Sequence, residues 1–234
     1  MRIKAVLFDL DDTLWPVAPV IQYAESTLHA WMAIHVPRVP AHFSIEQLRQ
    51  RRNALVASDP RFRYDLWSLR HTLLSKIFEQ VGEDPDMANM AMEIFSNARN
   101  EVALYEDVLP ALAQLGGHVV LGTVSNGFAD LKKIGLSSHF AVSLAAHSFG
   151  CAKPDPRIFL AACDVLELAP EQVAYVGDDL ALDVQGAQDV GMKGIWMNRH
   201  GIELMDTPHQ HVRPDAIAQD LHEVINYLSL LIRK

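Results

Sequence analysis

The sequence contains few cysteines and no long apolar run. The spacing of its two cysteines, Cys151 and Cys163, matches no metal-binding motif, and we expect both to be reduced packing residues rather than one disulfide. No stretch of about 18 apolar residues is present, as a membrane-spanning helix would need. A strand pattern begins within a few residues of Met1, which argues against a signal peptide. We therefore expect a cytoplasmic protein that has no membrane partner.

Positive charge is also scarce. Lysine and arginine total 20 against 29 aspartates and glutamates, so the formal net charge is −9. Nucleic-acid binding needs clustered positive charge, and no nucleic-acid partner is expected. Residues 38–76 are the exception, with a net charge of +5. This segment either attracts a small anion or forms a solvated helix face.

The apolar pattern predicts an α/β core. Residues 5–8 form a short apolar run with β-branched and aromatic members, which is typical of a buried parallel strand. From residue 107 onward, further strand patterns alternate with helical segments. These patterns cover residues 118–126, 140–147, 173–179 and 193–198. Five strands joined by helices indicate a Rossmann-like, doubly wound parallel sheet.

The segment between the first two strands has a helical character. It contains several amphipathic runs, one of which opens with Ser44 followed by Gln47, a capping-box pattern. Another run ends at Gly82, as expected for a helix C-cap. The predicted domains are therefore a Rossmann-like core, residues 1–16 and 107–234, and an α-helical insertion, residues 17–106.

Three aspartates follow the first strand in the stretch AVLFDLDDTLW. Side chains at i and i+2 share a face of an extended chain, so Asp9 and Asp11 should point the same way and Asp12 the other. Two carboxylates about 4 Å apart repel by roughly 4 kcal/mol at an effective dielectric constant of about 20. A bound cation, a shifted pKa or a lysine brought in by the fold could offset this repulsion. In the alternative interpretation, Asp12 and Thr13 cap the next helix and the other two aspartates are solvated.

Polar residues follow four of the predicted strands. They are Asp9 and Asp11, Ser125–Gly127, Lys153–Pro154 and Gly177–Asp179. Ligands of doubly wound sheets bind outside the carboxyl ends of the strands, so we expect these residues to meet at one edge. The structural alternatives are that Ser125 caps a helix starting near Phe128 and that Lys153 is a surface residue.

Four motifs together resemble the haloacid dehalogenase-like phosphohydrolases. They are DLDDT at residues 9–13, TVSNG at 123–127, KPDP at 153–156 and GDDLALD at 177–183. The match covers both ends of the chain and leaves the helical insertion where many members carry a cap. The resemblance therefore implies a capped member of this family.

The resemblance implies covalent phosphatase chemistry that depends on Mg²⁺. A positioned carboxylate splits the difficult hydrolysis of a phosphate monoester into two steps. By the resemblance, Asp9 attacks phosphorus to form an aspartyl-phosphate, while Asp11 protonates the leaving alcohol and later deprotonates water. The Asp9 carboxylate, the Asp11 main-chain carbonyl and Asp178 would hold Mg²⁺.

The resemblance also implies supporting roles for the other motif residues. Thr13 would orient the Asp9 loop, and Asp183 would support the metal or the lysine. Asp179 could compete for that role, so it is not assigned to the metal. The residues implied to contact phosphate are Leu10, Ser125, Asn126 and Lys153.

Other activities remain as alternatives. A 2-haloacid dehalogenase of the same family needs no acid at the second aspartate position, so the presence of Asp11 favours a phosphatase. A phosphomutase has similar core motifs. A non-catalytic interaction protein should have lost at least one catalytic residue, and none of the expected positions departs from the pattern.

The substrate class is suggested by a weaker resemblance. The segments FDLDDTLW, VGDDLALDVQGAQDVGM and IWMN are similar to a bacterial subgroup acting on flavin mononucleotide and on 5-amino-6-(5-phosphoribitylamino)uracil. Such ligands pair a phosphate with a planar ring, so aromatic side chains are candidate contacts. The candidates are Trp15, Phe62, Tyr64 and Trp67. We expect a small phosphorylated metabolite as the partner of a monomer or homodimer.

Overall fold

The computed structural model describes residues 2–232, which form two compact units. The first unit contains residues 2–16, 103–127 and 135–232, and the second contains residues 17–102 and 128–134. The second unit thus includes a short segment, 128–134, that the sequence pattern placed with the sheet. Phe128 packs there against Phe95, with ring centroids 6.1 Å apart.

The first unit contains a sheet of six parallel strands in the order β3-β2-β1-β4-β5-β6. The strands are β1 (Ala5–Phe8), β2 (Val120–Ser125), β3 (Val142–Ala145), β4 (Val173–Gly177), β5 (Lys193–Met197) and β6 (Ala216–Ala218). The predicted doubly wound fold and its five strands are confirmed. The sixth strand was not expected from the sequence, because three residues carry too little pattern to predict a strand.

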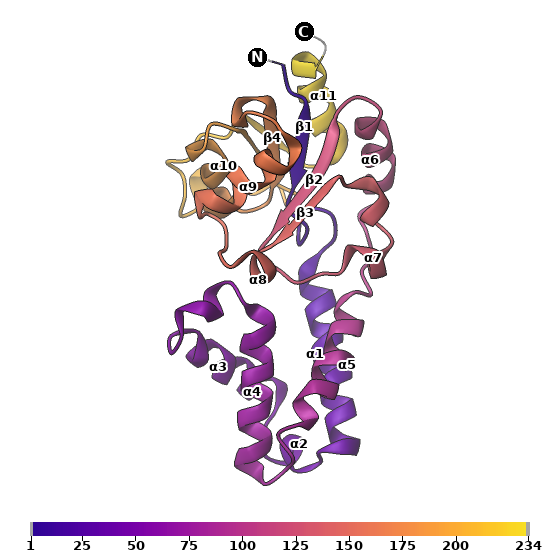
Figure 1. The fold of residues 1–234 in the computed structure, drawn as a ribbon, viewed down its shortest axis with the longest axis vertical. Helices are drawn as coiled ribbons and strands as arrows, with labels where there is room; N and C mark the ends of the chain where they lie inside the picture. Colours follow the sequence, from indigo (N-terminus) through magenta and orange to yellow (C-terminus); the bar gives the residue numbers. More distant parts are fainter. Residues whose placement is uncertain (1, 233–234) are drawn as a thin grey trace. The chain divides into compact units, whose positions relative to one another are not determined.

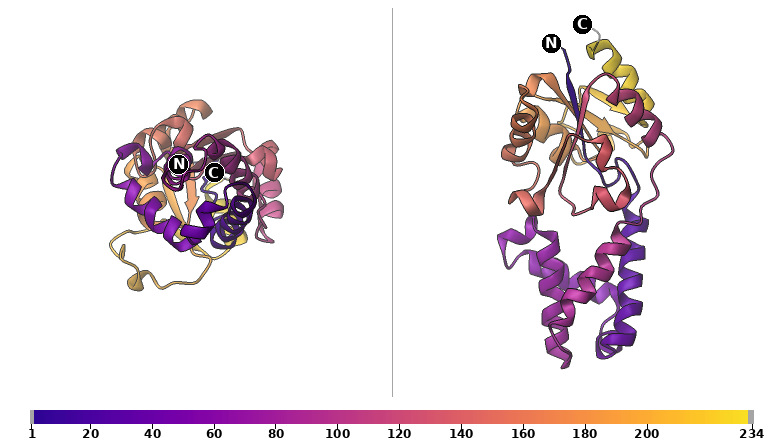
Figure 2. Two further views of the ribbon diagram at one scale, coloured as in Figure 1. Left: turned by 90° about the horizontal axis from the view of Figure 1, so that it is seen from below. Right: turned by 45° about the vertical axis from the view of Figure 1, so that its right-hand side comes forward.

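Helices cover both faces of this sheet, as Figures 1 and 2 show. Helices α9 (Pro156–Leu166) and α10 (Gly186–Asp189) lie on one face, and α6 (Val108–Gly116) and α11 (Leu221–Ile232) lie on the other. All four residues of β1 are buried, as expected for a central parallel strand covered on both faces.

Strands β2 and β3 lie on one side of β1, and strands β4 to β6 lie on the other side. Ala5 pairs with Val120 of β2 on one side and with Val173 of β4 on the other. A crevice forms outside the carboxyl ends of the strands at such a switch point. The fold therefore brings residues that follow β1, β2 and β4 to one place.

The second unit is helical. Its helices are α1 (Val17–His35), α2 (Arg38–His42), α3 (Ile45–Val56), α4 (Leu66–Val81), α5 (Met87–Arg99) and α7 (Leu131–Ile134), with a 3₁₀ turn at Pro60–Arg63. The predicted capping box is confirmed, since Gln47 N–H donates to Ser44 Oγ (3.3 Å) and Ser44 N–H to Gln47 Oε1 (2.8 Å). Gly82 ends α4 with φ +76°, a conformation that glycine adopts without strain.

Short elements complete the first unit. They are α8 (Ala146–Phe149), 3₁₀ turns at Ser137–His139, Pro170–Gln172 and Leu204–Asp206, and a π-helical turn at Leu180–Gln185. Cys151 and Cys163 are buried free thiols, which agrees with the expected packing role.

A buried carboxylate organises part of the basic segment in the helical unit. Glu25 of α1 is 7% exposed. Its Oε2 accepts a hydrogen bond from Arg49 Nε (2.7 Å) and lies 2.6 Å from Arg49 Nη2 in an ion pair. Arg70 Nη1 lies 3.7 Å from Glu25 Oε1, and its guanidinium stacks 3.6 Å from the centroid of the Phe95 ring. Burial and the charge of Arg52 lower the pKa of Arg70. Part of the positive charge of residues 38–76 therefore serves a buried ion pair.

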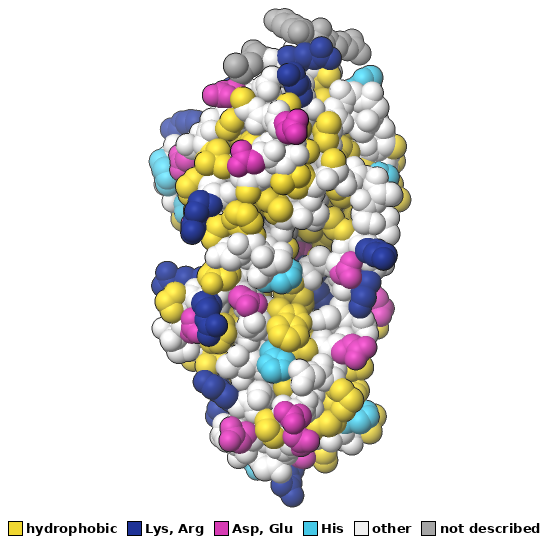
Figure 3. Space-filling view, in the orientation of Figure 1, with side chains coloured by type: hydrophobic (Ala, Val, Ile, Leu, Met, Phe, Trp, Pro, Cys, Tyr) yellow, Lys and Arg dark blue, Asp and Glu magenta, His cyan; other side chains and the backbone are white. Residues whose placement is uncertain are grey.

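Charged side chains of both signs lie on one face of the helical unit. Figure 3 shows lysine and arginine side chains interspersed with aspartate and glutamate on this visible face.

We expect Glu25→Gln to destabilise the helical unit. The change leaves Arg70 buried without its counter-charge, which typically costs about 3 kcal/mol. Glu46→Gln is the matched control, because Glu46 is exposed and lies 3.5 Å from the same Arg49; its effect should stay within about 0.5 kcal/mol. Urea denaturation followed by circular dichroism measures both, and equal effects would show that the buried pair has no special role.

Candidate active site

Asp9 lies directly after β1, at the switch point of the sheet. Its backbone N–H donates to Val176 O (2.9 Å), which continues the pairing with β4. The residue is 7% exposed, and its Oδ1 lies 2.5 Å from Lys153 Nζ. The strand thus fixes the Asp9 backbone while a lysine from a distant segment holds one carboxylate oxygen.

The residues after Asp9 form a tight loop. Leu10 O accepts hydrogen bonds from the N–H groups of Thr13 (3.3 Å) and Leu14 (2.8 Å). Asp12 has φ +56°, a left-handed conformation that aspartate tolerates better than most residues. Asp12 therefore lies in a loop that precedes the next helix, which starts at Val17.

Asp11 is held by a tryptophan of the same loop. Trp15 Nε1 donates to Asp11 Oδ1 at 2.8 Å, and the two residues form an isolated bridge. Trp15 is 0% exposed. It is therefore part of the core and presents no ring face to a ligand.

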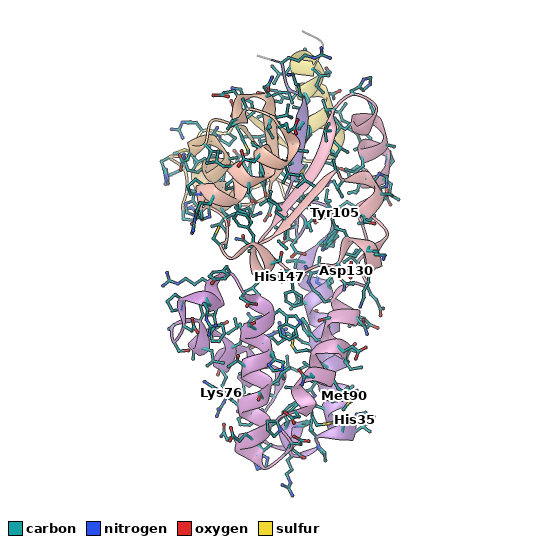
Figure 4. All side chains as sticks on the ribbon, in the orientation of Figure 1. His35, Lys76, Met90, Tyr105, Asp130 and His147 are labelled. Atoms are coloured by element: carbon teal, nitrogen blue, oxygen red, sulfur yellow. The ribbon has the colours of Figure 1, made fainter. Side chains whose placement is uncertain are left out.

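Arg199 stabilises this loop by donating a hydrogen bond to its backbone. The Arg199 guanidinium donates to Thr13 O (2.8 Å) and to both carboxylate oxygens of Asp107 (2.8 and 2.9 Å), and it stacks 4.2 Å from the Tyr105 ring centroid. Tyr105, labelled in Figure 4, donates its N–H to Leu14 O (3.1 Å). The Thr13 hydroxyl is buried without a hydrogen-bond partner among the described residues. The loop is thus fixed through its backbone.

Ser125 and Asn126 follow β2. The Ser125 hydroxyl accepts from Gly127 N–H (3.0 Å), and no helix starts at Phe128, because α7 begins at Leu131. Asn126 exchanges two hydrogen bonds with the Lys153 backbone, accepting from its N–H (2.8 Å) and donating to its carbonyl (3.2 Å). Asn126 therefore positions the lysine backbone.

Lys153 is the centre of the site and is buried rather than on the surface. Its Nζ lies 2.5 Å from Asp9 Oδ1, 2.6 Å from Asp183 Oδ1 and 2.9 Å from the Tyr175 hydroxyl. Tyr175 in turn donates to Val124 O (2.7 Å). Carboxylates are strong acceptors for a buried ammonium, so this geometry keeps Lys153 charged and raises its pKa well above the usual value.

The turn after β4 supplies the second acidic group. Asp183 Oδ2 accepts from Asp179 N–H (3.0 Å), and a Cβ added to Gly177 would lie 2.3 Å from this oxygen. Glycine is therefore required at 177 for Asp183 to approach. The Asp179 side chain accepts from the N–H groups of Ala181 and Leu182 (2.8 Å each), so it caps the π-helical turn.

The site holds more negative than positive charge. Carboxylate oxygens of Asp9, Asp178 and Asp183 lie within 4.8 Å of one another, beside the single ammonium of Lys153. Burial and the neighbouring carboxylates raise the pKa of Asp178 to about 8, and burial raises that of Asp9 to about 7 despite Lys153. Ionising the whole cluster therefore needs additional positive charge.

A divalent cation fits this donor set. Mg²⁺ prefers carboxylate oxygens. The raised pKa values of Asp9 and Asp178 reflect the repulsion and burial of their negative charges, and a bound Mg²⁺ would offset that negative charge. Asp9 and Asp178 of the predicted ligands belong to the cluster, together with Asp183, whose other contacts are Lys153 and a backbone N–H. Asp11 was predicted to contribute its carbonyl, while its carboxylate is held by Trp15.

The sequence reasoning missed three supporting residues. Tyr175 looked like one more apolar strand residue, and Trp15 looked like a ligand contact. Arg199 lies 92 positions from its partner Asp107 and carries no local pattern. For Tyr175 a signal existed, because its hydroxyl is the only one in an otherwise apolar buried strand.

Of the aromatic candidates in the helical unit, Trp67 is the most exposed. Trp67 is 37% exposed and stacks on His71, with ring centroids 5.2 Å apart and an interplanar angle of 14°. Phe62 is buried, and Tyr64 is half-buried.

Within residues 2–232, no helix combines the length and the apolar character required to cross a bilayer.

Comparison with known proteins identifies the family. A model described as haloacid dehalogenase-like hydrolase matches residues 3–191. The chain is 29% identical to 5-amino-6-(5-phospho-D-ribitylamino)uracil phosphatase YigB of Escherichia coli, with 91% of each chain covered. It is 30% identical to glyceraldehyde 3-phosphate phosphatase of Methanopyrus kandleri, again with 91% of each covered.

A solved structure is also similar over nearly the whole chain. The crystal structure of 2-haloacid dehalogenase from Pseudomonas syringae pv. Tomato DC3000 superposes with a TM-score of 0.89 at 35% identity, covering 97% of this chain and 99% of that one. The relatives therefore include two kinds of reaction, which the site chemistry must distinguish.

We expect Mg²⁺ to stabilise the protein more at about pH 8.5 than at about pH 5. The folded-state pKa values of Asp9 and Asp178, about 7 and 8, exceed the unfolded values near 4. Without metal, stability therefore falls as pH rises through this window, because the folded state holds protons that the unfolded state has lost. Mg²⁺ must displace those protons, so it binds better once they are gone.

Thermal unfolding with EDTA or with Mg²⁺ measures this difference. A hundredfold excess of metal over its Kd corresponds to about 2.7 kcal/mol. Asp178→Asn should remove most of the shift, whereas Asp164→Asn, an exposed position of α9, should retain it. A metal-induced shift that is equal at both pH values would contradict the assignment of these carboxylates.

Proposed function

This chain belongs to the haloacid dehalogenase-like hydrolase family, and on that premise we propose that it is a Mg²⁺-dependent phosphatase of small phosphorylated metabolites. The observation that carries the proposal is the cluster of Asp9, Asp178 and Asp183 around one ammonium, with Asp11 two residues beyond Asp9. A bound Mg²⁺ supplies positive charge that offsets these carboxylates and the phosphoryl oxygens.

In the first half-reaction, the Asp9 carboxylate attacks phosphorus. Lys153 engages Oδ1, which leaves Oδ2 for the attack. The new bond joins this oxygen to phosphorus as the bond to the leaving oxygen breaks, and Asp11 gives its proton to that oxygen. The Ser125 hydroxyl and the backbone N–H groups after β1 and β2 hold the transferring oxygens.

In the second half-reaction, water attacks the aspartyl-phosphate. Asp11 now takes the proton of the water, and the bond between phosphorus and Asp9 breaks. The products are inorganic phosphate and the original carboxylate. Lys153 remains charged throughout, because Asp183 and Tyr175 hold its ammonium when Asp9 is esterified.

A 2-haloacid dehalogenase is the second candidate, because the similar Pseudomonas syringae structure bears that title. A carboxylate nucleophile and a lysine would serve both reactions. A halide leaves carbon without a proton, so that reaction has no use for an acid at Asp11. It also brings no phosphoryl charge to the site, so it does not need a cation bound by the carboxylates beside the nucleophile. The charge of this site therefore favours phosphate chemistry.

The substrate proposal is a phosphate ester that carries a planar ring, such as flavin mononucleotide or 5-amino-6-(5-phosphoribitylamino)uracil. It is supported by the similarity to the E. coli phosphatase named for the second compound. In this proposal residues 17–106 act as the substrate-selecting cap of a cytoplasmic enzyme. The stacked pair of Trp67 and His71 offers a ring face of the kind that such substrates need.

We expect Mg²⁺-dependent phosphate release from a panel of flavin mononucleotide, sugar phosphates, nucleotides and glyceraldehyde 3-phosphate. Halide release from 2-haloacids should be absent. Phosphate and halide assays on the same preparation, each with and without EDTA, decide between the candidates. Halide release that survives EDTA, together with no phosphate release, would establish the dehalogenase. Conversion of a sugar bisphosphate to its isomer without net release would instead indicate a phosphomutase.

Asp9→Asn should abolish phosphate release, by at least about 10³-fold, because an amide cannot form the phosphoenzyme. Asp164→Asn is the matched control and should retain full turnover, since its carboxylate is exposed on α9. Circular dichroism verifies that both variants are folded. Retained turnover in a folded Asp9→Asn protein would remove Asp9 as the nucleophile.

A further inference from the structure

The contact between Trp15 and Asp11 has a consequence for proton transfer. The indole Nε1 donates to Asp11 Oδ1 at 2.8 Å. An indole N–H is a donor only, so Oδ1 must act as the acceptor. The indole therefore fixes the orientation of the Asp11 carboxyl group through one of its oxygens.

We infer that Trp15 is a positioning residue that orients the Asp11 carboxyl group for proton transfer. This inference rests on the proposed phosphatase function. As the ester bond breaks, its electron pair goes to the leaving oxygen and the Asp11 proton follows. In the second step, a proton of the attacking water returns to Asp11, while Oδ1 keeps the indole hydrogen bond in both protonation states.

The loop around Trp15 is built to hold this orientation. The Trp15 side chain is fully buried, so the indole ring cannot turn away from Asp11. The Trp15 carbonyl also accepts the Asp12 N–H at 2.7 Å, beside the left-handed backbone of Asp12. Side chain and backbone of the same residue thus tie both ends of the loop, and such rigid support is what a proton donor needs to stay aligned.

A purely structural tryptophan would leave a different kinetic signature. Loss of packing lowers stability and affects all substrates alike. Loss of the aligned proton matters only when the leaving oxygen needs one, because a phenolate with a low pKa leaves unaided whereas an alkoxide does not. Dependence on the leaving group therefore separates the two roles.

The test replaces Trp15 and compares p-nitrophenyl phosphate with alkyl phosphates. Trp15→Phe keeps an aromatic ring without the donor, and site-specific incorporation of benzothienylalanine keeps the bicyclic shape with sulfur in place of N–H. For both replacements, we expect kcat/KM, which reports the first half-reaction, to fall by about 10²-fold on alkyl phosphates and by less than about threefold on p-nitrophenyl phosphate. Trp31→Phe, a partly buried tryptophan of the helical unit, should leave the ratio of the two kcat/KM values unaltered.

The outcomes separate this inference from the proposed function. Equal loss on both substrate types with the benzothienyl residue, or no loss at all, overturns the role of Trp15 while the phosphatase stands. Absence of phosphate release in the unmodified protein overturns the proposed function and the inference with it.

Discussion

The site depends on the hydrogen bonds that the buried Lys153 ammonium makes with two carboxylates. The ammonium lies between two carboxylates that belong to different strand ends, Asp9 after β1 and Asp183 after β4. Desolvating three charged groups is expensive unless they contact one another directly, and the ammonium donates a hydrogen bond to each of the two carboxylates. The Tyr175 hydroxyl supplies a further acceptor for the ammonium, so this charge is well satisfied.

The topology of the sheet makes that arrangement possible. Asp9 and Lys153 are 144 positions apart. Lys153 follows β3 and Asp183 follows β4, and because these strands lie on opposite sides of β1, the sheet brings both residues beside Asp9. Glycine at 177 lets the Asp183 carboxylate approach β4, and Asn126 fixes the lysine backbone from β2. The contacts of Lys153 with Asp9, Asn126 and Asp183 each cross from one strand end to another. The cluster therefore forms only when β1 to β4 have come together.

The sequence predicted those features that are written in local patterns or in the parallel topology. Apolar runs located five strands, and the rule for strand ends placed Asp9, Ser125, Lys153 and Asp178 on one edge. The caps of two helices followed from residues within one turn. Contacts such as Arg199 with Asp107 could not be predicted, because they join distant segments and depend on the angle at which loops leave the sheet.

Trp15 and segment 128–134 pack differently from what the sequence predicted, and they show the same limit of local patterns. Trp15 follows an acidic loop and resembled a ligand contact, but the left-handed backbone at Asp12 turns the chain so that the indole is buried against the Asp11 carboxylate. Segment 128–134 follows β2 directly and yet belongs to the helical unit, since Phe128 packs against Phe95. Sequence patterns report which residues are apolar, whereas tertiary packing decides which neighbour they bury against.

The similarity to both phosphatases and a dehalogenase has a physical explanation, because the nucleophile and the groups around it would have separate roles in the site. A carboxylate nucleophile held by a buried lysine is useful against phosphorus and against carbon alike, so the sheet and the Asp9–Lys153 pair can be shared. What differs is the charge that must be handled around the nucleophile. A phosphate ester brings negative charge and a leaving oxygen that needs a proton. In the proposed function, groups outside that pair meet both requirements: the carboxylates would hold a cation, and Asp11 would supply the proton. The reaction type is therefore encoded in the residues surrounding the nucleophile, and in this chain those residues match the demands of phosphate.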